Sequence, residues 1–130
     1  MSDERSTRSK PGQVALTFLQ AVLEGDFETA RAYCTSDVVL RIEGLQSTHG
    51  HEGLRDIMTF AAETSTNVRY VTHHVLGTGD SAAINRTTYM TIGGQDLTLE
   101  VGAFFTLRDG LICEWTDYQD VQSLNRALGH

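Results

Sequence analysis

The fold of this 130-residue chain is decided near its end, by the stretch Phe105-Thr-Leu-Arg-Asp-Gly-Leu-Ile-Cys-Glu-Trp-Thr-Asp-Tyr-Gln-Asp120. Two runs rich in β-formers flank Arg108-Asp-Gly110, a short turn that supplies the positive φ angles of a tight reversal. This pattern predicts an antiparallel hairpin. In its second arm, alternate side chains point to opposite faces. One face is expected to carry Ile112, Glu114, Thr116 and Tyr118, and the other Cys113, Trp115, Asp117 and Gln119.

The rest of the second half of the chain has the same pattern of β-rich runs separated by short turns. β-rich runs lie near 67–76, 81–92, 96–107 and 111–121, with short Gly- and Asp-containing connections between them. Such connections suit antiparallel pairs, because parallel crossovers need a dozen or more residues. The runs are about ten to twelve residues long, against a usual five or six, and strands of that length must coil. Gly102 is a natural bend point inside one of them.

The first half of the chain is mostly helical. Apolar residues recur at helical spacing before Gly25, which ends a first helix. Asp26 can cap a second, short helix that ends at Ser36-Asp37, and residues 38–42 read as a strand. Residues 44–50 are expected to form a loop before a third amphipathic helix. Helices followed by a meander predict an α+β fold: a cone-shaped, strongly curved antiparallel sheet packed against three N-terminal helices, enclosing an apolar pocket.

Length and composition limit the domain organisation and the partners. We expect one domain over residues 13–122, with a disordered N-terminal tail over 1–12 and a C-terminal tail over 123–130. Ten Lys plus Arg against 17 Asp plus Glu give a formal net charge of −7, which argues against nucleic acid and an anionic membrane surface. No apolar run approaches the roughly 20 residues of a membrane span. With no secretory signal, we expect a cytoplasmic protein whose two cysteines are reduced.

Two charged residues stand where a sheet interior is expected. Asp117 follows Trp115 on the same face, so it lies either against an apolar wall or, at the strand end, in solvent. A carboxyl group against an apolar wall becomes a usable acid or base near neutral pH. Arg86 lies within an apolar strand and must either point outward or be held by an acid, because an unpaired buried charge is costly.

Metal and cofactor chemistry have no signature in the sequence. The histidine clusters are His49-x-His51 and His73-His74. Adjacent strand residues point to opposite faces, so His73 and His74 cannot chelate one ion together. We expect no metal site and no cofactor.

Three segments resemble a known family. They are the helix Leu16–Asp26, the turn Gly50–Leu54 and, above all, the ending Phe105–Asp120. Over roughly residues 12–121 the chain resembles the limonene-epoxide-hydrolase and SnoaL-like cyclase branch of the nuclear-transport-factor-2-like fold. The resemblance implies that an arginine bridges two aspartates, one of which protonates an epoxide while the other activates water.

Matched residue by residue, the resemblance places Arg86 on that arginine, Asp117 on the last-strand aspartate and Trp115 on its tryptophan neighbour. The other aspartate is replaced by Thr88, and the water-holding tyrosine and asparagine positions hold Leu40 and Ile42. An Arg86 partner favours the ionised carboxylate, and therefore a base or orienting anion rather than a proton donor. Another group must then supply the acid.

Further residues are possible acid–base or hydrogen-bonding partners, although a structural or solvated role is the alternative for each. They are Thr88, Glu43, His49 and Tyr118. Glu43 lies near the base position of ketosteroid-isomerase-like relatives but would need a bulge to turn inward. The resemblance also implies a substrate-binding wall, which consists of Trp115, Leu99, Val101, Met90 and Leu40.

The expected activity is cofactor-free acid–base chemistry on a hydrophobic small molecule of terpenoid, steroid or polyketide type. Epoxide opening by water or by a substrate hydroxyl is preferred, with Asp117 as base and Arg86 as its orienter. Double-bond isomerisation, dehydration and non-catalytic binding of an apolar ligand are alternatives. Glu100 should point to the outer sheet face, where it is either simply exposed or part of a homodimer interface.

Overall fold

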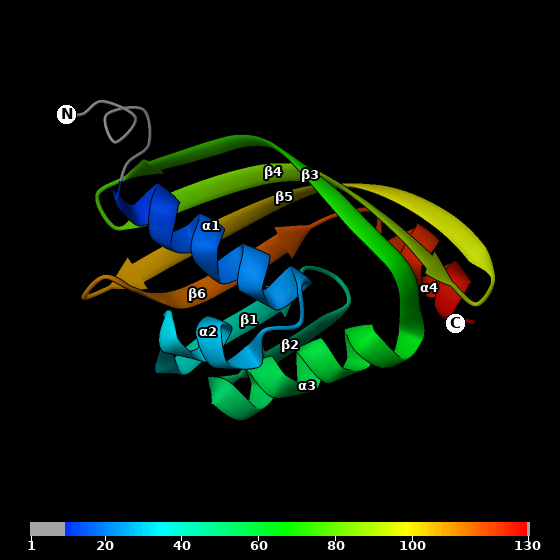
Figure 1. Cartoon of the computed structure of the whole chain (residues 1–130), viewed down its shortest axis with the longest axis horizontal. Coiled ribbons are helices and arrows are strands. Elements are labelled where there is room, and N and C mark those ends of the chain that lie inside the picture. Colours follow the sequence, from blue (N-terminus) through cyan, green and yellow to red (C-terminus); the bar gives the residue numbers. More distant parts are fainter. Residues whose placement is uncertain (1–9, 130) are drawn as a thin grey trace.

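Helices cover one face of a six-stranded sheet in the computed structural model, which describes residues 10–129 (Figure 1). The helices are α1 (Lys10–Leu23), α2 (Phe27–Ala32), α3 (Gly50–Thr64) and α4 (Val121–Leu128). The strands are β1 (Cys34–Ile42), β2 (Gln46–His49), β3 (Ser65–Thr78), β4 (Ser81–Ile92), β5 (Gln95–Arg108) and β6 (Leu111–Tyr118). The α+β class is confirmed. Of the predicted tail over 1–12, residues 1–9 lie outside the described part, and Lys10 begins α1.

The sheet order is β2-β1-β6-β5-β4-β3. The meander from β3 to β6 is antiparallel, as its short turns predict; in one of these turns Gly93 and Gly94 both have positive φ. The prediction of an antiparallel sheet throughout is wrong, because β1 runs parallel to β6, with Leu40 beside Trp115. The chain between these two strands contains α3 and four strands, so it is long enough for a parallel pairing.

The first half differs from the prediction at its boundaries. Asp26 caps α2 by accepting a hydrogen bond from the Thr29 backbone N–H at 3.2 Å, as expected. However, α2 ends at Ala32, and β1 already begins at Cys34 rather than at residue 38. The loop expected over 44–50 contains β2, which pairs with β1. All four residues of β2 are polar, so no alternation of apolar and polar residues marks this strand in the sequence.

In β6, the predicted alternation of side chains holds in only part of the strand. Trp115 and Asp117 share the inner face, but Ile112 also points into the core, where it is fully buried. The reason is a bulge: Thr106 pairs with Glu114 and Leu107 with Ile112, which leaves Cys113 as an extra residue. The bulge shifts the side-chain period by one residue.

The stretch expected as a C-terminal tail mostly forms α4. Asp120 caps this helix by accepting a hydrogen bond from the Ser123 backbone N–H at 3.1 Å. Leu124 then packs with Ile92, Leu99 and Val101 in a second apolar cluster, beside the main core. Within the described residues, no helix is long and apolar enough to cross a membrane.

Candidate active site

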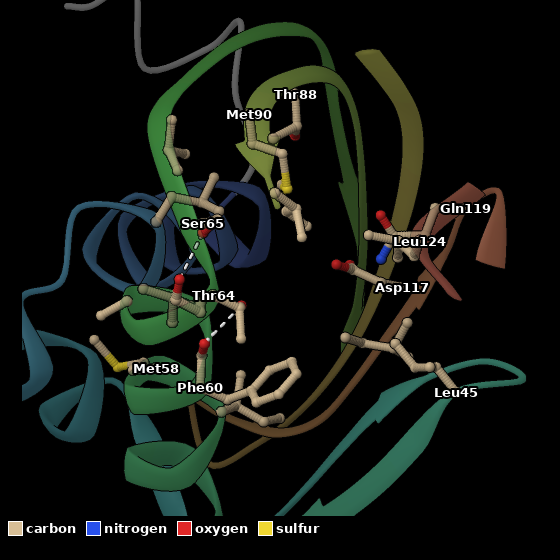
Figure 2. Close-up of a pocket in the computed structure, with 18 of the residues that line it drawn as sticks. Leu45, Met58, Phe60, Thr64, Ser65, Thr88, Met90, Asp117, Gln119 and Leu124 are labelled. Atoms are coloured by element: carbon tan, nitrogen blue, oxygen red, sulfur yellow. Dashed lines mark hydrogen bonds between the residues drawn. The ribbon is translucent and has the colours of Figure 1, made fainter. Parts of the chain in front are cut away.

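A cavity of about 330 Å³ lies between the helices and the inner face of the sheet (Figure 2). Most of its wall is apolar and comes from the end of α1, from α3 and from α4. The sheet contributes Arg86, Thr88, Met90, Ile92, Trp115 and Asp117. Figure 2 shows the Asp117 carboxylate pointing into this space, across from Phe60 and Thr64 of α3.

An ion pair lies on the wall of the cavity. The Arg86 Nη2 donates to Asp117 Oδ2 at 3.1 Å, and the two side chains are only 4% and 5% exposed. The Arg86 Nε donates to Thr88 Oγ1 at 3.1 Å, and Trp115 Nε1 donates to Asp117 Oδ1 at 2.6 Å. Each carboxylate oxygen therefore has its own donor, which fixes the orientation of Asp117 in the free protein.

Strand geometry brings these groups together. Arg86, Thr88 and Met90 take alternate positions on β4, and Trp115 and Asp117 do so on β6, so all five reach the inner face. The strand β5 lies between β4 and β6, and the long arginine side chain spans it to reach Asp117.

Beneath the pair, aromatic rings form a rigid floor. Phe18 of α1 meets the Trp115 ring edge-on at a centroid distance of 5.5 Å. Phe105 stacks on Trp115 at 6.2 Å. These contacts fix the indole that donates to Asp117, since aromatic pairs of this geometry add to the energy of burial.

The hydrogen bonds of Arg86 are incomplete. Its buried Nη1 has no hydrogen-bond partner among the described residues. A buried unpaired donor costs free energy, and a buried ion pair is rarely better for stability than well-packed apolar side chains. Polar groups retained at such a cost are typical of functional sites.

Of the residues expected in the site, Arg86, Asp117, Thr88, Trp115 and Met90 line the cavity. The three other expected wall residues do not line it. Leu40 is fully buried in the main core, while α4, which was not predicted, covers Leu99 and Val101.

The remaining candidate partners also lie elsewhere. Glu43 and His49 are exposed at or beyond the ends of β1 and β2. No bulge turns Glu43 inward: Ile42, paired with Asp117, lines the cavity, and the Glu43 backbone N–H donates to the Asp117 carbonyl. Tyr118 follows Asp117 on β6 and so takes the outer face, where it is 50% exposed and packs edge-on against Phe104.

Several lining residues were missed by sequence reasoning. Met58 and Phe60 come from the predicted helix α3, whereas Leu124 and Leu128 come from α4. Glu24, at the end of α1, also lines the cavity. No periodic pattern marks a single carboxylate after the last turn of a helix, so only the tertiary structure reveals it. Among the described residues, no three His, Cys, Asp or Glu side chains gather as metal ligands would.

Comparison with family models gives a match to the SnoaL-like domain over residues 15–115, which is most of the chain. The chain belongs to the SnoaL-like family. The matched segment runs from α1 to Trp115 and so contains the Arg86 side of the ion pair, while Asp117 follows it by two residues. None of the curated proteins matches the sequence.

Solved structures show the nuclear-transport-factor-2-like (NTF2-like) fold. An NTF2-like protein of unknown function from Burkholderia pseudomallei is 17% identical, with a TM-score of 0.83 over 94% of this chain and 99% of that one. An LEH-like epoxide hydrolase of M. tuberculosis is 23% identical, with a TM-score of 0.76 over 94% and 91%. A protein described as a SnoaL-like polyketide cyclase, from Shewanella denitrificans, is 17% identical, with a TM-score of 0.79 over 93% and 98%.

Proposed function

We propose that this SnoaL-like protein is an acid–base enzyme that acts without a cofactor on a hydrophobic small molecule, of terpenoid, steroid or polyketide type. The observation that carries the proposal is the Arg86–Asp117 pair, buried on the wall of an apolar cavity. In our proposal this cavity is the enclosed pocket of a cone-shaped domain. An apolar molecule that fills it would bring its reacting oxygen to the pair in a water-poor environment, where charges act strongly.

The preferred reaction is epoxide opening by water or by a hydroxyl of the substrate. Asp117 would take the proton of the attacking O–H as the new C–O bond forms and the epoxide C–O bond breaks. The oxygen released from the ring would take up that proton at the end of the step. Arg86 and Trp115 hold the carboxylate in place, which is the positioning that an oriented base requires.

One observation favours a second reaction class. Thr88 binds Arg86 Nε, so the pair contains a single carboxylate and no second acid. Isomerisation of a double bond or dehydration can begin with one base that removes a proton next to a carbonyl group. The unpartnered Nη1 of Arg86 is a donor that would suit the resulting enolate oxygen after a small shift of the side chain.

Turnover of a panel of apolar epoxides and enones tests the proposal. Asp117→Asn keeps the shape of the side chain and removes the base, so we expect a loss of about 100-fold or more in kcat/KM. Asp120→Asn is the matched control, because this carboxylate caps α4 and does not line the cavity.

Equal turnover by wild type and Asp117→Asn would refute the acid–base scheme. If the panel is not turned over but apolar ligands raise the melting temperature, the protein is a ligand-binding module and the enzyme proposal is wrong.

A further inference from the structure

A second acidic residue lines the same cavity at a position exposed to solvent. Glu24, at the end of α1, lines the cavity together with Leu23 and Gly25, whereas Asp117 belongs to the sheet. The backbone of Glu24 is fixed by its N–H bond to the Gln20 carbonyl at 2.9 Å. The resemblance to epoxide hydrolases places the second acid at the position of Thr88 and gives no indication of Glu24.

A tyrosine holds this carboxylate. The Tyr70 hydroxyl donates to Glu24 Oε2 at 2.7 Å. Tyr70 lies opposite Thr88 in the β3–β4 register, and directly paired residues point to the same face, so the ring stands on the inner face of the sheet. The bond thus links β3 to the end of α1 at the edge of the cavity.

The hydrogen bond between Tyr70 and Glu24 does not depend on pH in the physiological range. Burial and the Glu24 carboxylate raise the pKa of Tyr70 to about 12, while the charge of Arg86 opposes this rise. The tyrosine therefore remains a donor at any physiological pH. The Tyr70 hydroxyl donates its proton to Oε2, so Oε1 of Glu24 can accept another hydrogen bond.

Among residues 10–129, no Lys, Arg or His lies at ion-pair distance from Glu24, in contrast to Asp117, which is paired with Arg86. The cavity therefore has a buried, charge-balanced ion pair on the sheet side and, at the end of α1, an exposed carboxylate that a tyrosine hydroxyl holds in place.

We propose that Glu24, positioned by Tyr70, binds a hydroxyl group on the apolar ligand of this cavity. The inference rests on the proposed function, because it takes the cavity as the ligand site, and it narrows the ligand class to hydrophobic molecules that carry a hydroxyl. Glu24 contacts the ligand, and Tyr70 is a positioning residue. A hydroxyl donating to a carboxylate forms a short, charge-assisted hydrogen bond, which a methyl ether cannot make.

Two probes of nearly the same shape test this inference. We would measure the affinities of 2-naphthol and 2-methoxynaphthalene by titration calorimetry at pH 7. Wild type should bind the naphthol about tenfold more tightly, the effect of one hydrogen bond to a charged group. Glu24→Gln and Tyr70→Phe should bring this ratio close to one, while the affinity for 2-methoxynaphthalene stays unchanged and shows that the cavity is intact.

Matched controls separate the hydroxyl site from general effects. Tyr89→Phe removes a tyrosine hydroxyl from the outer face, and Glu28→Gln removes a carboxylate that is paired with Arg31 on α2. Both should keep the wild-type ratio. Asp117→Asn tells which carboxylate the hydroxyl meets: the preference stays if the hydroxyl binds Glu24 and is lost if it binds Asp117.

The outcomes distinguish the two proposals. If wild type binds both probes equally, or if only Asp117→Asn removes the preference, Glu24 does not bind the hydroxyl and the inference is wrong, although the cavity still binds ligands. If neither probe binds to wild type, the cavity is not an apolar ligand site, and the proposed function fails together with the inference.

Discussion

Asp117 is a buried carboxylate on the wall of the cavity, with one hydrogen-bond donor for each of its oxygens. Arg86 and Trp115 each donate a hydrogen bond to one of its oxygens, and Thr88 accepts one from the Nε of Arg86. Truncating one member of such a pair leaves a buried charge without a partner, which is strongly destabilising, whereas Asp117→Asn keeps a carbonyl oxygen that can still accept a hydrogen bond. The arrangement therefore tolerates few substitutions, and the neutral Thr88 is the position at which chemistry could be changed without removing the pair.

Replacing Thr88 tests how much a second acid adds. Thr88→Asp would place a carboxylate beside Arg86 Nε, in the position that the resemblance assigns to an aspartate. If the reaction is epoxide opening, we expect diol formation or cyclisation to rise by about 100-fold, the typical contribution of one general acid or base. Initial rates on the epoxide panel, with Thr88→Asn as an uncharged control, measure this effect. A folded Thr88→Asp protein that opens no epoxide faster than Thr88→Asn would contradict this reaction and favour isomerisation or dehydration.

At the residue scale, the sequence is enough to predict those site residues whose positions follow from the alternation of side chains along one strand. Trp115 and Asp117 are two residues apart on one strand, so their shared face can be read from alternation. Arg86 could be placed inward only through the resemblance, because its acid lies two strands away. Glu24 and Tyr70 could not be found, since they are 46 residues apart and meet only when α1 packs on β3.

At the scale of elements, the predictions are correct for long strands between clear turns and wrong for short or irregular segments. The strands β3, β4 and β5 are long and rich in β-forming residues, and their turns carry glycine, so their predicted bounds lie within a few residues of the observed ones. The bulge at Cys113 and the four-residue strand β2 have no such signal. The eight-residue helix α4 is marked by its Asp120 cap and by Gly129 at its end, but it is stable only because Leu124 is buried against the sheet.

The cap of α4 gives a prediction at this scale. Asp120→Ala removes an acceptor for the Ser123 N–H, so we expect a lower melting temperature and faster amide exchange in α4, whereas Asp120→Asn keeps an acceptor and should resemble wild type at pH 7. Hydrogen bonds from Ser123, its hydroxyl first, lower the pKa of Asp120 below its ordinary value. The stabilisation is therefore present above about pH 4 and is lost as the pH falls through the lowered pKa.

Melting curves of the three proteins at pH 7 and in acid measure this effect. The difference between wild type and Asp120→Ala should shrink in acid as the wild-type cap becomes protonated. A difference that is the same at both pH values would show that the ionised cap does not stabilise α4.

At the scale of the molecule, the two faces of the sheet have different roles. The inner face carries the core and the cavity, while the outer face exposes Phe104 and Tyr118, which are 55% and 50% exposed. Glu100 also lies on the outer face and accepts a hydrogen bond from the Thr87 hydroxyl at 2.9 Å. A homodimer formed through this face stays a prediction, in which the exposed rings would be buried.

The central claim is that the ligand of this protein meets the Arg86–Asp117 pair inside the cavity. A crystal structure of Asp117→Asn soaked with an apolar hydroxy-epoxide tests it most directly, because the variant would hold the substrate without consuming it. We expect the molecule to lie between α3 and the sheet, with its epoxide oxygen or attacking hydroxyl within about 3 Å of the residue 117 side chain. Ligand density elsewhere on the protein, with the cavity filled only by water, would contradict the claim.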